Sequence, residues 1–568
     1  MSVPARLRGA TQSLAGAALL ITVVTIASRL LGFARQLVQA HEVGTVGVGT
    51  AYTSANLLPN ILYEVAAGGA LAGAVVPVLA GAIARRARLD VNRSASALLT
   101  WALVVLVPLA LVLLAFAGPI ASLVPHVGHG EAAATTTYFL RVFALQIPLY
   151  GVGFVLSGVL QAHKRFFWPA FAPMLSSVVV IGAYLVFGHL DADPTDVAAA
   201  SRSALAWLAW GTTAGVAAMS LPLFVPAWRT GTSLRLTLRF PPGQAARARR
   251  LALAGVGAVV AQQVASLAIL WAANRWGGDG AFPVYTYAQA VYVLPYAVLA
   301  VPLATSTFPR LAERAALGDH VGFARLVAPT TRIVLTVTAV GVAALVAASD
   351  AVQAFFAAFT PGGVAGMAAT VAWLAPGLLG FALVFHLSRV LYSLDHGRAA
   401  VRATALGWGV VVVGALVLPP VLARGASDAV RTLEGIGAAS SLGMTVAGVA
   451  LLWAVHRYAP GRPLAGVART VLALAGGAAL GALAGLLTSD VLLPDDAGSV
   501  ATVAGGLESL GVGLVAALVG AVVVVAVSLV GDRSTLRGLT SLRRRDPAPV
   551  RVAEDAATGT TDEPREDA

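Results

Sequence analysis

Long runs of apolar residues, separated by short polar segments, follow one another along almost the whole chain. Most runs reach the about 20 residues that an α-helix needs to cross the hydrocarbon core of a bilayer. A soluble fold cannot bury so much apolar surface. The pattern predicts an all-α integral membrane protein with about fourteen transmembrane helices. They are expected at residues 13–35, 51–83, 98–124, 135–160, 167–188, 204–227, 251–273, 283–308, 333–349, 367–388, 401–422, 434–455, 469–488 and 509–530.

The composition agrees with a membrane location and excludes several kinds of site. Of the residues, 58% are hydrophobic and 11% are charged, whereas soluble domains carry about 25% charged residues. Cysteine is absent, which excludes disulfides, thiolate metal sites and a cysteine nucleophile. The first apolar run is long and no small-residue cleavage site follows it closely, so we expect a retained helix rather than a signal peptide.

Basic residues are distributed unevenly among the predicted loops. With the N-terminus inside, the inner segments hold most of the 38 lysines and arginines, and the positive-inside rule then places both termini in the cytoplasm. The net charge of +12 therefore indicates membrane orientation and not nucleic-acid binding. The outer loops hold only Arg202, Arg275, Arg424 and Arg431.

Two segments resemble each other at a separation of about 230 residues. One begins at Tyr52 and closes at Pro77, and the other begins at Tyr285 and closes at Pro309, with spacings of 25 and 24 residues. They fall in the second and eighth predicted helices, so the copies run in the same direction, as in transporters built from two parallel repeats. Chance matching between Ala- and Val-rich helices is the alternative.

Two arginines lie within the first predicted span. Arg29 and Arg35 are six residues apart, which places them about 9 Å apart along the axis and about 120° apart around it. A charge at the bilayer centre costs at least about 2.5 kcal/mol unless it faces water or a partner. Guanidinium binds a diphosphate bidentately and stays charged. We therefore expect both to bind an anion, with snorkelling to the interface as the alternative, chiefly for Arg35.

Glu64 is the clearest acid inside a predicted span, and Asn60 and Tyr63 precede it. It is expected to form an ion pair with Arg29 or Arg35, or to carry a proton in a coupled transport cycle. The glycines that follow it are expected to serve helix packing. Arg141 and His386 are weaker candidates, for which an interface anchor and a satisfied polar contact are the alternatives.

Signals for an enzyme are weak. Asp191-Ala192-Asp193 imitates a metal-binding DxD motif, but it lies in a loop predicted to be outside, where a solvated pair is the usual explanation. No paired carboxylates and no His/Glu metal pair occur on one helix face. We expect a transporter without cofactor or metal.

Five stretches resemble the MurJ/MviN family, the lipid II flippases of the MOP exporter superfamily. The first-helix motif and the element that opens the fifth helix are the specific ones. The likeness extends from about residue 14 to residue 530. The five stretches are SRLLGFARQLVQA (28–40), ANLLPNILYEVAAGGALAGAVVPVLA (55–80), QAHKRFFWPA (161–170), YAQAVYVLPYAVLAVPLATSTFPRLAE (287–313) and RVLYSLD (389–395).

The resemblance implies a domain plan and a cargo. Two pseudo-repeated six-helix lobes would surround a cationic cavity and work by alternating access. The cargo would be undecaprenyl-diphosphate-linked peptidoglycan precursor, moved from the inner to the outer leaflet of the bacterial plasma membrane. The predicted parts are a cytoplasmic N-terminus (1–12), an N-lobe (13–227), a linker (228–250), a C-lobe (251–455), two further helices (456–530) and a disordered cytoplasmic tail (531–568).

The resemblance also implies site residues, with departures. Arg29 and Arg35 match cavity arginines of the family. Gln36 stands where an acid is common, and Tyr63 or Glu64 and Gln289 stand where arginines are common. The predicted seventh helix lacks the acid of the family's cation site. Diphosphate binding would then depend on fewer arginines or on substitutes such as Arg141.

Two other functions are compatible with the same sequence. One is a cation-coupled exporter of drugs or of another polyprenyl-linked glycan, and the other is a membrane-bound glycosyl or polyprenyl transferase. For the flippase, the expected partners are lipid II, membrane lipids and proteins of cell-wall synthesis or division, without nucleic acid.

Overall fold

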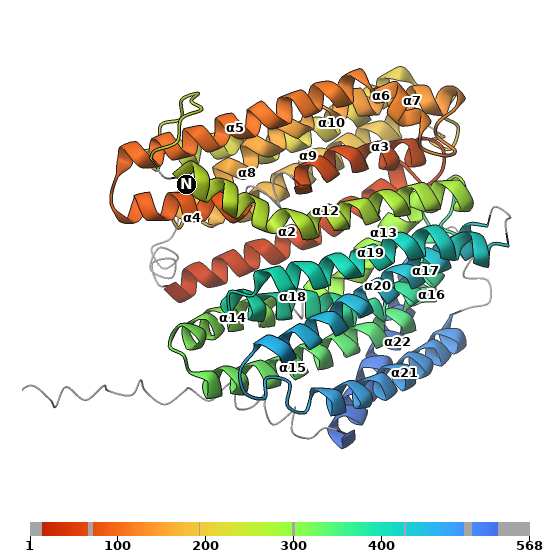
Figure 1. The fold of residues 1–568 in the computed structure, drawn as a ribbon. Helices are drawn as coiled ribbons and strands as arrows, with labels where there is room; N and C mark the ends of the chain where they lie inside the picture. Colours follow the sequence, from red (N-terminus) through yellow and green to blue (C-terminus); the bar gives the residue numbers. More distant parts are fainter. Residues whose placement is uncertain are drawn as a thin grey trace, which may run out of the picture.

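The computed structural model describes residues 14–65, 72–191, 193–242, 244–297, 301–424, 428–493 and 503–531, and these residues form helices and connecting turns without a strand. The predicted N-terminal segment 1–12, most of the predicted tail and the small-residue run 66–70 lie outside the described residues. Figure 1 shows two groups of helices, one above the other, with α21 and α22 on the outside of the lower group.

The upper group in Figure 1, called the N-lobe below, contains the helices up to α11. Their bounds are α2 (Leu14–Glu42), α3 (Val48–Tyr63), α4 (Ala72–Ala84), α5 (Arg88–Ala115), α6 (Ala117–Ser122), α7 (Gly130–Phe143), α8 (Gln146–Ala162), α9 (Phe167–Leu190), α10 (Arg202–Ser220), η2 (Leu221–Leu223) and α11 (Phe224–Trp228).

The helices from α12 onward are called the C-lobe; in Figure 1, α12 lies at the level of α2, between the two groups, and it packs on α19 of the C-lobe as well as on α4 of the N-lobe, whereas α21 and α22 pack on α15. The bounds are α12 (Gln244–Ala272), η3 (Ala273–Gly277), α13 (Ala281–Pro295), α14 (Val301–Ala316), α15 (His320–Ala347), α16 (Ser349–Ala357), α17 (Met367–Leu374), α18 (Gly377–Ser393), α19 (Gly397–Leu422), α20 (Ala429–Tyr458), α21 (Val467–Leu492) and α22 (Val503–Gly531).

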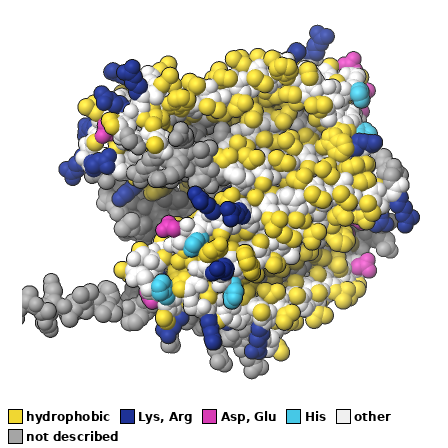
Figure 2. All heavy atoms as spheres, viewed as in Figure 1, with side chains coloured by type: hydrophobic (Ala, Val, Ile, Leu, Met, Phe, Trp, Pro, Cys, Tyr) yellow, Lys and Arg dark blue, Asp and Glu magenta, His cyan; other side chains and the backbone are white. Residues whose placement is uncertain are grey.

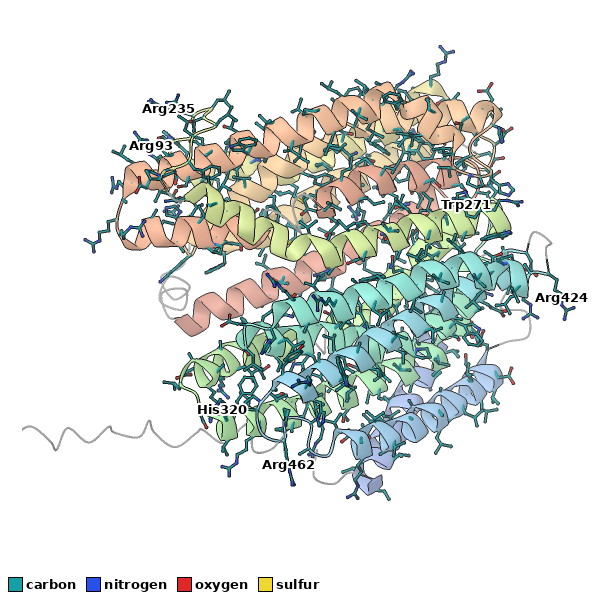
Figure 3. The ribbon with its side chains drawn as sticks, in the orientation of Figure 1. Arg93, Arg235, Trp271, His320, Arg424 and Arg462 are labelled. Atoms are coloured by element: carbon teal, nitrogen blue, oxygen red, sulfur yellow. The ribbon has the colours of Figure 1, made fainter. Side chains whose placement is uncertain are left out.

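The helices confirm a polytopic membrane protein. Ten described helices are long and apolar enough to span a bilayer, and the pair α17 and α18, bent by 47°, provides an eleventh. The three other predicted spans coincide with α2, with α3 and α4, and with α13 and α14. Figure 2 shows a broad apolar surface, with basic side chains gathered mainly toward its two ends. Figure 3 places Arg93, Arg235, His320 and Arg462 toward one end and Arg424 and Trp271 toward the other.

Several helices extend beyond the predicted spans because they continue past their apolar parts. The span expected at 333–349 is α15, which begins at His320, where the Asp319 side chain accepts a hydrogen bond from the Gly322 backbone N–H at 2.8 Å. Such a cap stabilises a helix start in polar sequence, which a hydropathy window overlooks. Similarly, the span expected at 98–124 begins at Arg88.

The spans expected at 51–83 and 283–308 do not stay regular α-helix throughout their described residues. α3 is followed by a π-helical turn at residues 64–65 and α13 by one at residues 296–297. Glu64 and Tyr296 are as far apart in sequence as Pro77 and Pro309, so the two turns lie at the same position of the repeat. Because both copies have a π-helical turn at the same position, a true internal repeat is favoured over chance matching. Turns of this kind often occur at functional sites.

Each lobe has cores of its own, and α2 packs against both. Phe33, Leu37 and Ala40 pack in a core formed by C-lobe helices. Val38 packs against a core of N-lobe helices. Because these positions lie on different sides of one helix, α2 forms the seam between the lobes.

Candidate functional site

The seam helix α2 carries both arginines that the sequence singles out. Arg29 is exposed and Arg35 is partly buried. The helical offset between them turns them toward different neighbours: Arg35 lies near tyrosines of the N-lobe, whereas Arg29 lies near Tyr296 of the C-lobe. One helix therefore presents a guanidinium to each lobe.

On the N-lobe side, Arg35 faces a group of polar aromatic residues. Tyr150 on α8 donates a hydrogen bond from its hydroxyl to Asn60 Oδ1 at 3.0 Å. The ring of Tyr63 packs against the ring of Tyr150 with 4.4 Å between centroids. The Nε atom of Arg35 is buried and has no hydrogen-bond partner among the described residues. An unpaired buried donor of a charged group is costly, so this geometry favours a ligand that accepts hydrogen bonds.

On the C-lobe side, a third arginine joins the site. Arg389 on α18 places its guanidinium carbon 3.5 Å from the ring centroid of Phe385 and donates to the Phe385 carbonyl oxygen at 2.7 Å. The ring of Tyr296 meets the ring of Phe385 with centroids 5.5 Å apart. Arg29 and Arg389 both act electrostatically on Tyr296. We call Arg29, Arg35 and Arg389 the interlobe basic cluster.

No carboxylate neutralises this cluster among the residues that the structure describes. There, the only ion pairs are Arg314 with Asp319 and Arg431 with Glu434, both outside the cluster. The predicted ion pair of Glu64 with Arg29 or Arg35 is therefore absent, and Glu64 is exposed at the π-helical turn after α3. Guanidinium groups without carboxylate partners, lying between apolar bundles, are suited to bind a multiply charged anion.

The other predicted residues lie around the cluster or away from it. Gln36 is half-buried on α2, and Gln289 is exposed on α13. Arg141 is exposed in the last turn of α7. His386 is buried, with its Nε2 atom 3.2 Å from the Thr331 hydroxyl. Arg141, the substitute suggested from the sequence, is therefore not part of the cluster. Arg389, which the sequence did not indicate, is part of it.

Sequence reasoning missed Arg389 because the span predicted at 367–388 ends one residue before it. The helix α18 extends to Ser393, which places Arg389 one turn inside it. An arginine four residues after a phenylalanine on one helix face was the available signal, because that spacing allows a cation–π contact.

At one end of the molecule the two lobes are hydrogen-bonded to each other. Asp279, in the turn before α13, accepts from the Gly47 backbone N–H at 2.9 Å and also from the Thr50 hydroxyl. Thr45 donates from its hydroxyl to the Gly363 carbonyl oxygen at 2.8 Å. We call these contacts the interlobe latch. They lie near the ends of α2 and α3, at the end of the molecule marked by Trp271 in Figure 3.

The DxD imitation is a structural turn. The hydroxyl of Thr195 and its backbone N–H, the latter at 3.0 Å, both donate to Asp193 Oδ1. These bonds hold the pKa of the Asp193 carboxyl below its usual range. No group of three or more His, Asp or Glu side chains placed to bind a metal occurs in the described part of the chain.

A family model described as "Lipid II flippase MurJ" matches residues 39–500. The chain belongs to the MurJ family. A curated relative from Rhizobium tropici, named "Probable lipid II flippase MurJ", is 25% identical over 410 residues, which cover 70% of this chain and 74% of the relative. The predicted family is thus confirmed.

Two solved structures share the fold of this MurJ family member. A lipid II flippase MurJ in an inward closed conformation has a TM-score of 0.69 at 17% identity, with 91% of this chain and 100% of the other covered. An inward-facing MATE multidrug transporter of the MOP superfamily has a TM-score of 0.62 at 17% identity, over 78% of this chain and 98% of the other. Because both cargo classes occur on this fold, the cargo has to be argued from the site.

Proposed function

We propose that this protein is a lipid II flippase, which moves the undecaprenyl-diphosphate-linked peptidoglycan precursor from the inner to the outer leaflet of the bacterial plasma membrane. Besides family membership, the interlobe basic cluster supports this cargo over others. Its three guanidinium groups lack carboxylate partners among the described residues. Such a site attracts a diphosphate and repels a cationic drug.

In the proposed binding step, Arg29, Arg35 and Arg389 contact the diphosphate from three directions. Arg35 offers its unpartnered buried Nε from the N-lobe side of α2. Arg389 is held in place by the Phe385 ring and carbonyl, so little side-chain freedom is lost when the anion binds. The hydroxyls of the nearby Tyr150 and Tyr296 are further donors for sugar or phosphate oxygens.

The proposed orientation has both termini in the cytoplasm, as the positive-inside rule indicates. The interlobe latch then closes the extracellular side. Lipid II enters from the inner leaflet, and the diphosphate is released outward only after Asp279 has separated from Gly47 and Thr50. The lipid tail stays in the bilayer while the lobes rock, so that only the polar headgroup crosses the protein.

Replacing Asp279 by asparagine should increase the outward-open population. The side-chain amide of asparagine carries no charge. Its NH2 group, which is a donor, would face either the Gly47 N–H or the Thr50 hydroxyl, where Asp279 offers an oxygen that accepts. Losing charge-assisted hydrogen bonds of about 1.5–3 kcal/mol shifts such an equilibrium about tenfold to a hundredfold. Opening is measured in the cysteine-free chain with the substitution Ser54→Cys and an impermeant thiol reagent applied outside, because Ser54 is buried and faces Asn274 across the lobe boundary.

The matched control is Asp428→Asn. Asp428 caps α20 by accepting from the Arg431 backbone N–H at 3.0 Å, and it lies at the same end without bridging the lobes. We expect faster labelling of the introduced thiol with Asp279→Asn and unchanged labelling with Asp428→Asn. Equal labelling in both would show that the latch does not hold the closed state.

The function itself is tested by depletion. When the protein is depleted in its own host, lipid II should accumulate in the inner leaflet, and an externally added enzyme that cleaves lipid II should release less product. Drug accumulation in the same cells should stay constant. Normal delivery of lipid II to the outer leaflet, in a strain without another flippase, would refute the proposal.

A further inference from the structure

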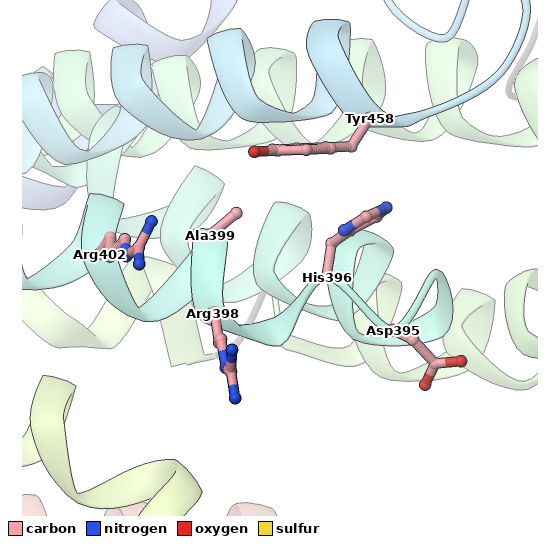
Figure 4. A pocket seen from close by; sticks show the side chains of 6 residues that line it. All are labelled: Asp395, His396, Arg398, Ala399, Arg402 and Tyr458. Carbon is pink, nitrogen blue, oxygen red and sulfur yellow. The ribbon is translucent and has the colours of Figure 1, made fainter.

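A cavity of about 520 Å³ opens at the end of the C-lobe opposite the interlobe latch. It lies where the turn between α18 and α19 meets the last residue of α20, well away from the seam helix. Nothing in the proposed transport step uses it. Its lining residues, shown in Figure 4, are Asp395, His396, Arg398, Ala399, Arg402 and Tyr458.

Part of the cavity is a slot formed by His396, Ala399, Arg402 and Tyr458. The imidazole of His396 stacks on the ring of Tyr458 with 4.3 Å between centroids and 27° between planes. Figure 4 shows the Tyr458 ring above Ala399, with His396 and Arg402 on opposite sides of Ala399, and Asp395 pointing away. The side chain at the bottom of the slot, that of Ala399, is only a methyl group. A compact polar group therefore has room beside the Arg402 guanidinium, the Tyr458 phenol and the His396 imidazole.

The slot is electrostatically positive. Arg402 beside the slot has no ion-pair partner in the part of the chain that the structure describes. Figure 4 shows Arg398 and Asp395, whose charges are opposite, both pointing away from the Tyr458 ring. α19 begins at Gly397 and runs for 26 residues, so its first-turn N–H groups add the positive end of a helix dipole to the charge of Arg402. Such an arrangement matches a phosphate group, which accepts several hydrogen bonds and carries negative charge.

The surface next to the slot is suited to acyl chains. Leu406, one turn along α19 from Arg402, is 56% exposed, and Val413 farther along the same face is 63% exposed. On α20, Trp453 is 66% exposed. Tryptophan and tyrosine near the end of an apolar surface mark the headgroup level of a bilayer. The slot therefore lies where the headgroup of a lipid lying along α19 would be.

We propose that this slot binds the phosphate of an anionic glycerophospholipid, with the acyl chains along the exposed apolar face of α19. Under the orientation above, the lipid belongs to the inner leaflet. Basic pockets between transmembrane helices at this depth bind anionic headgroups. Free inorganic phosphate has the same binding chemistry but does not use the apolar face. The site is separate from the interlobe basic cluster, and its test does not depend on flipping.

The test measures which lipid lies next to the slot. In the cysteine-free chain, the substitution Leu406→Cys carries a fluorophore, and the protein is reconstituted in vesicles with brominated phosphatidylglycerol or brominated phosphatidylcholine, which quench on contact. We expect phosphatidylglycerol to be preferred at this label. A second label at Val421→Cys, at the far end of α19 and 64% exposed, should show no such preference.

Two variants remove the site by different means. Arg402→Gln removes a charge and should reduce the preference about fivefold, as expected for one arginine near an anionic lipid. Ala399→Leu fills the slot with a larger apolar side chain without changing the charge, and it should also reduce the preference for phosphatidylglycerol. Arg462→Gln, which removes an exposed arginine near the same end, should leave it intact.

The outcomes separate the two phosphate sources. If millimolar inorganic phosphate abolishes the preference when chloride at equal ionic strength does not, the slot is a free-phosphate site and the lipid assignment is wrong. If Ala399→Leu and Arg402→Gln leave the preference at the wild-type level, or if Arg462→Gln lowers it equally, general surface charge explains it and the slot is not a site.

Discussion

Replacing Arg29 by alanine is expected to slow the delivery of lipid II to the outer leaflet by about tenfold to a hundredfold. In the proposed binding step, the change removes charge-assisted hydrogen bonds to the diphosphate, each worth about 1.5–3 kcal/mol. The neutral Tyr296 across the seam, which lies near Arg29, cannot replace them. Arg29→Lys should retain part of the activity, since it keeps the charge but loses bidentate geometry.

The measurement is enzymatic detection of outer-leaflet lipid II in cells that carry only the variant. Protein abundance in the membrane is measured in parallel, and Arg29→Ala should accumulate normally because Arg29 is exposed and forms no ion pair with a described residue. Arg424→Ala, at an exposed arginine toward the latch end of the C-lobe, is the control. Wild-type delivery with Arg29→Ala would remove Arg29 from the site without affecting the family assignment.

The second large effect is expected for Arg389. Arg389→Ala should reduce lipid II delivery to an extent similar to Arg29→Ala, because both guanidinium groups act electrostatically on Tyr296 and, in the proposed binding step, would share one diphosphate. Arg389→Lys should rescue less than Arg29→Lys, since the planar contact with Phe385 at 3.5 Å favours guanidinium over ammonium.

A double-variant comparison separates shared binding from separate roles. If the two arginines bind one anion, the combined loss in Arg29→Ala with Arg389→Ala should be smaller than the product of the single losses. Arg325→Ala changes an exposed arginine on α15 and should have no effect. Delivery at the wild-type level in Arg389→Ala would show that Arg389 only packs against Phe385.

Hydropathy was enough to predict a polytopic all-α membrane protein, because a bilayer imposes a minimum length on every apolar span. The orientation that the loop charges predict stays a prediction. The errors occurred where those constraints do not apply. α15 starts early at a polar cap, and the repeat helices are interrupted at π-helical turns. Hydropathy measures how apolar a segment is and carries no information on whether its backbone is continuous.

The candidate site was only partly visible in the sequence. Arg29 and Arg35 stood out because a charge within an apolar run needs a reason. Arg389 and Asp279 did not, because both lie near helix ends, where charge is ordinary. Their proposed roles depend on residues far away in the chain: Arg389 acts electrostatically on Tyr296, and Asp279 accepts a hydrogen bond from Gly47. Such proximity exists only in the folded protein.

The position of α2 at the seam has a consequence for the timing of transport. Phe33, Leu37 and Ala40 pack with the C-lobe core while Val38 packs with the N-lobe core, so α2 cannot follow both lobes when they separate. It must exchange neighbours on one of its faces, and its two arginines turn with it. In the proposed mechanism, opening of the outer side and weakening of diphosphate binding are therefore one mechanical event, which would protect the cargo from release on the wrong side.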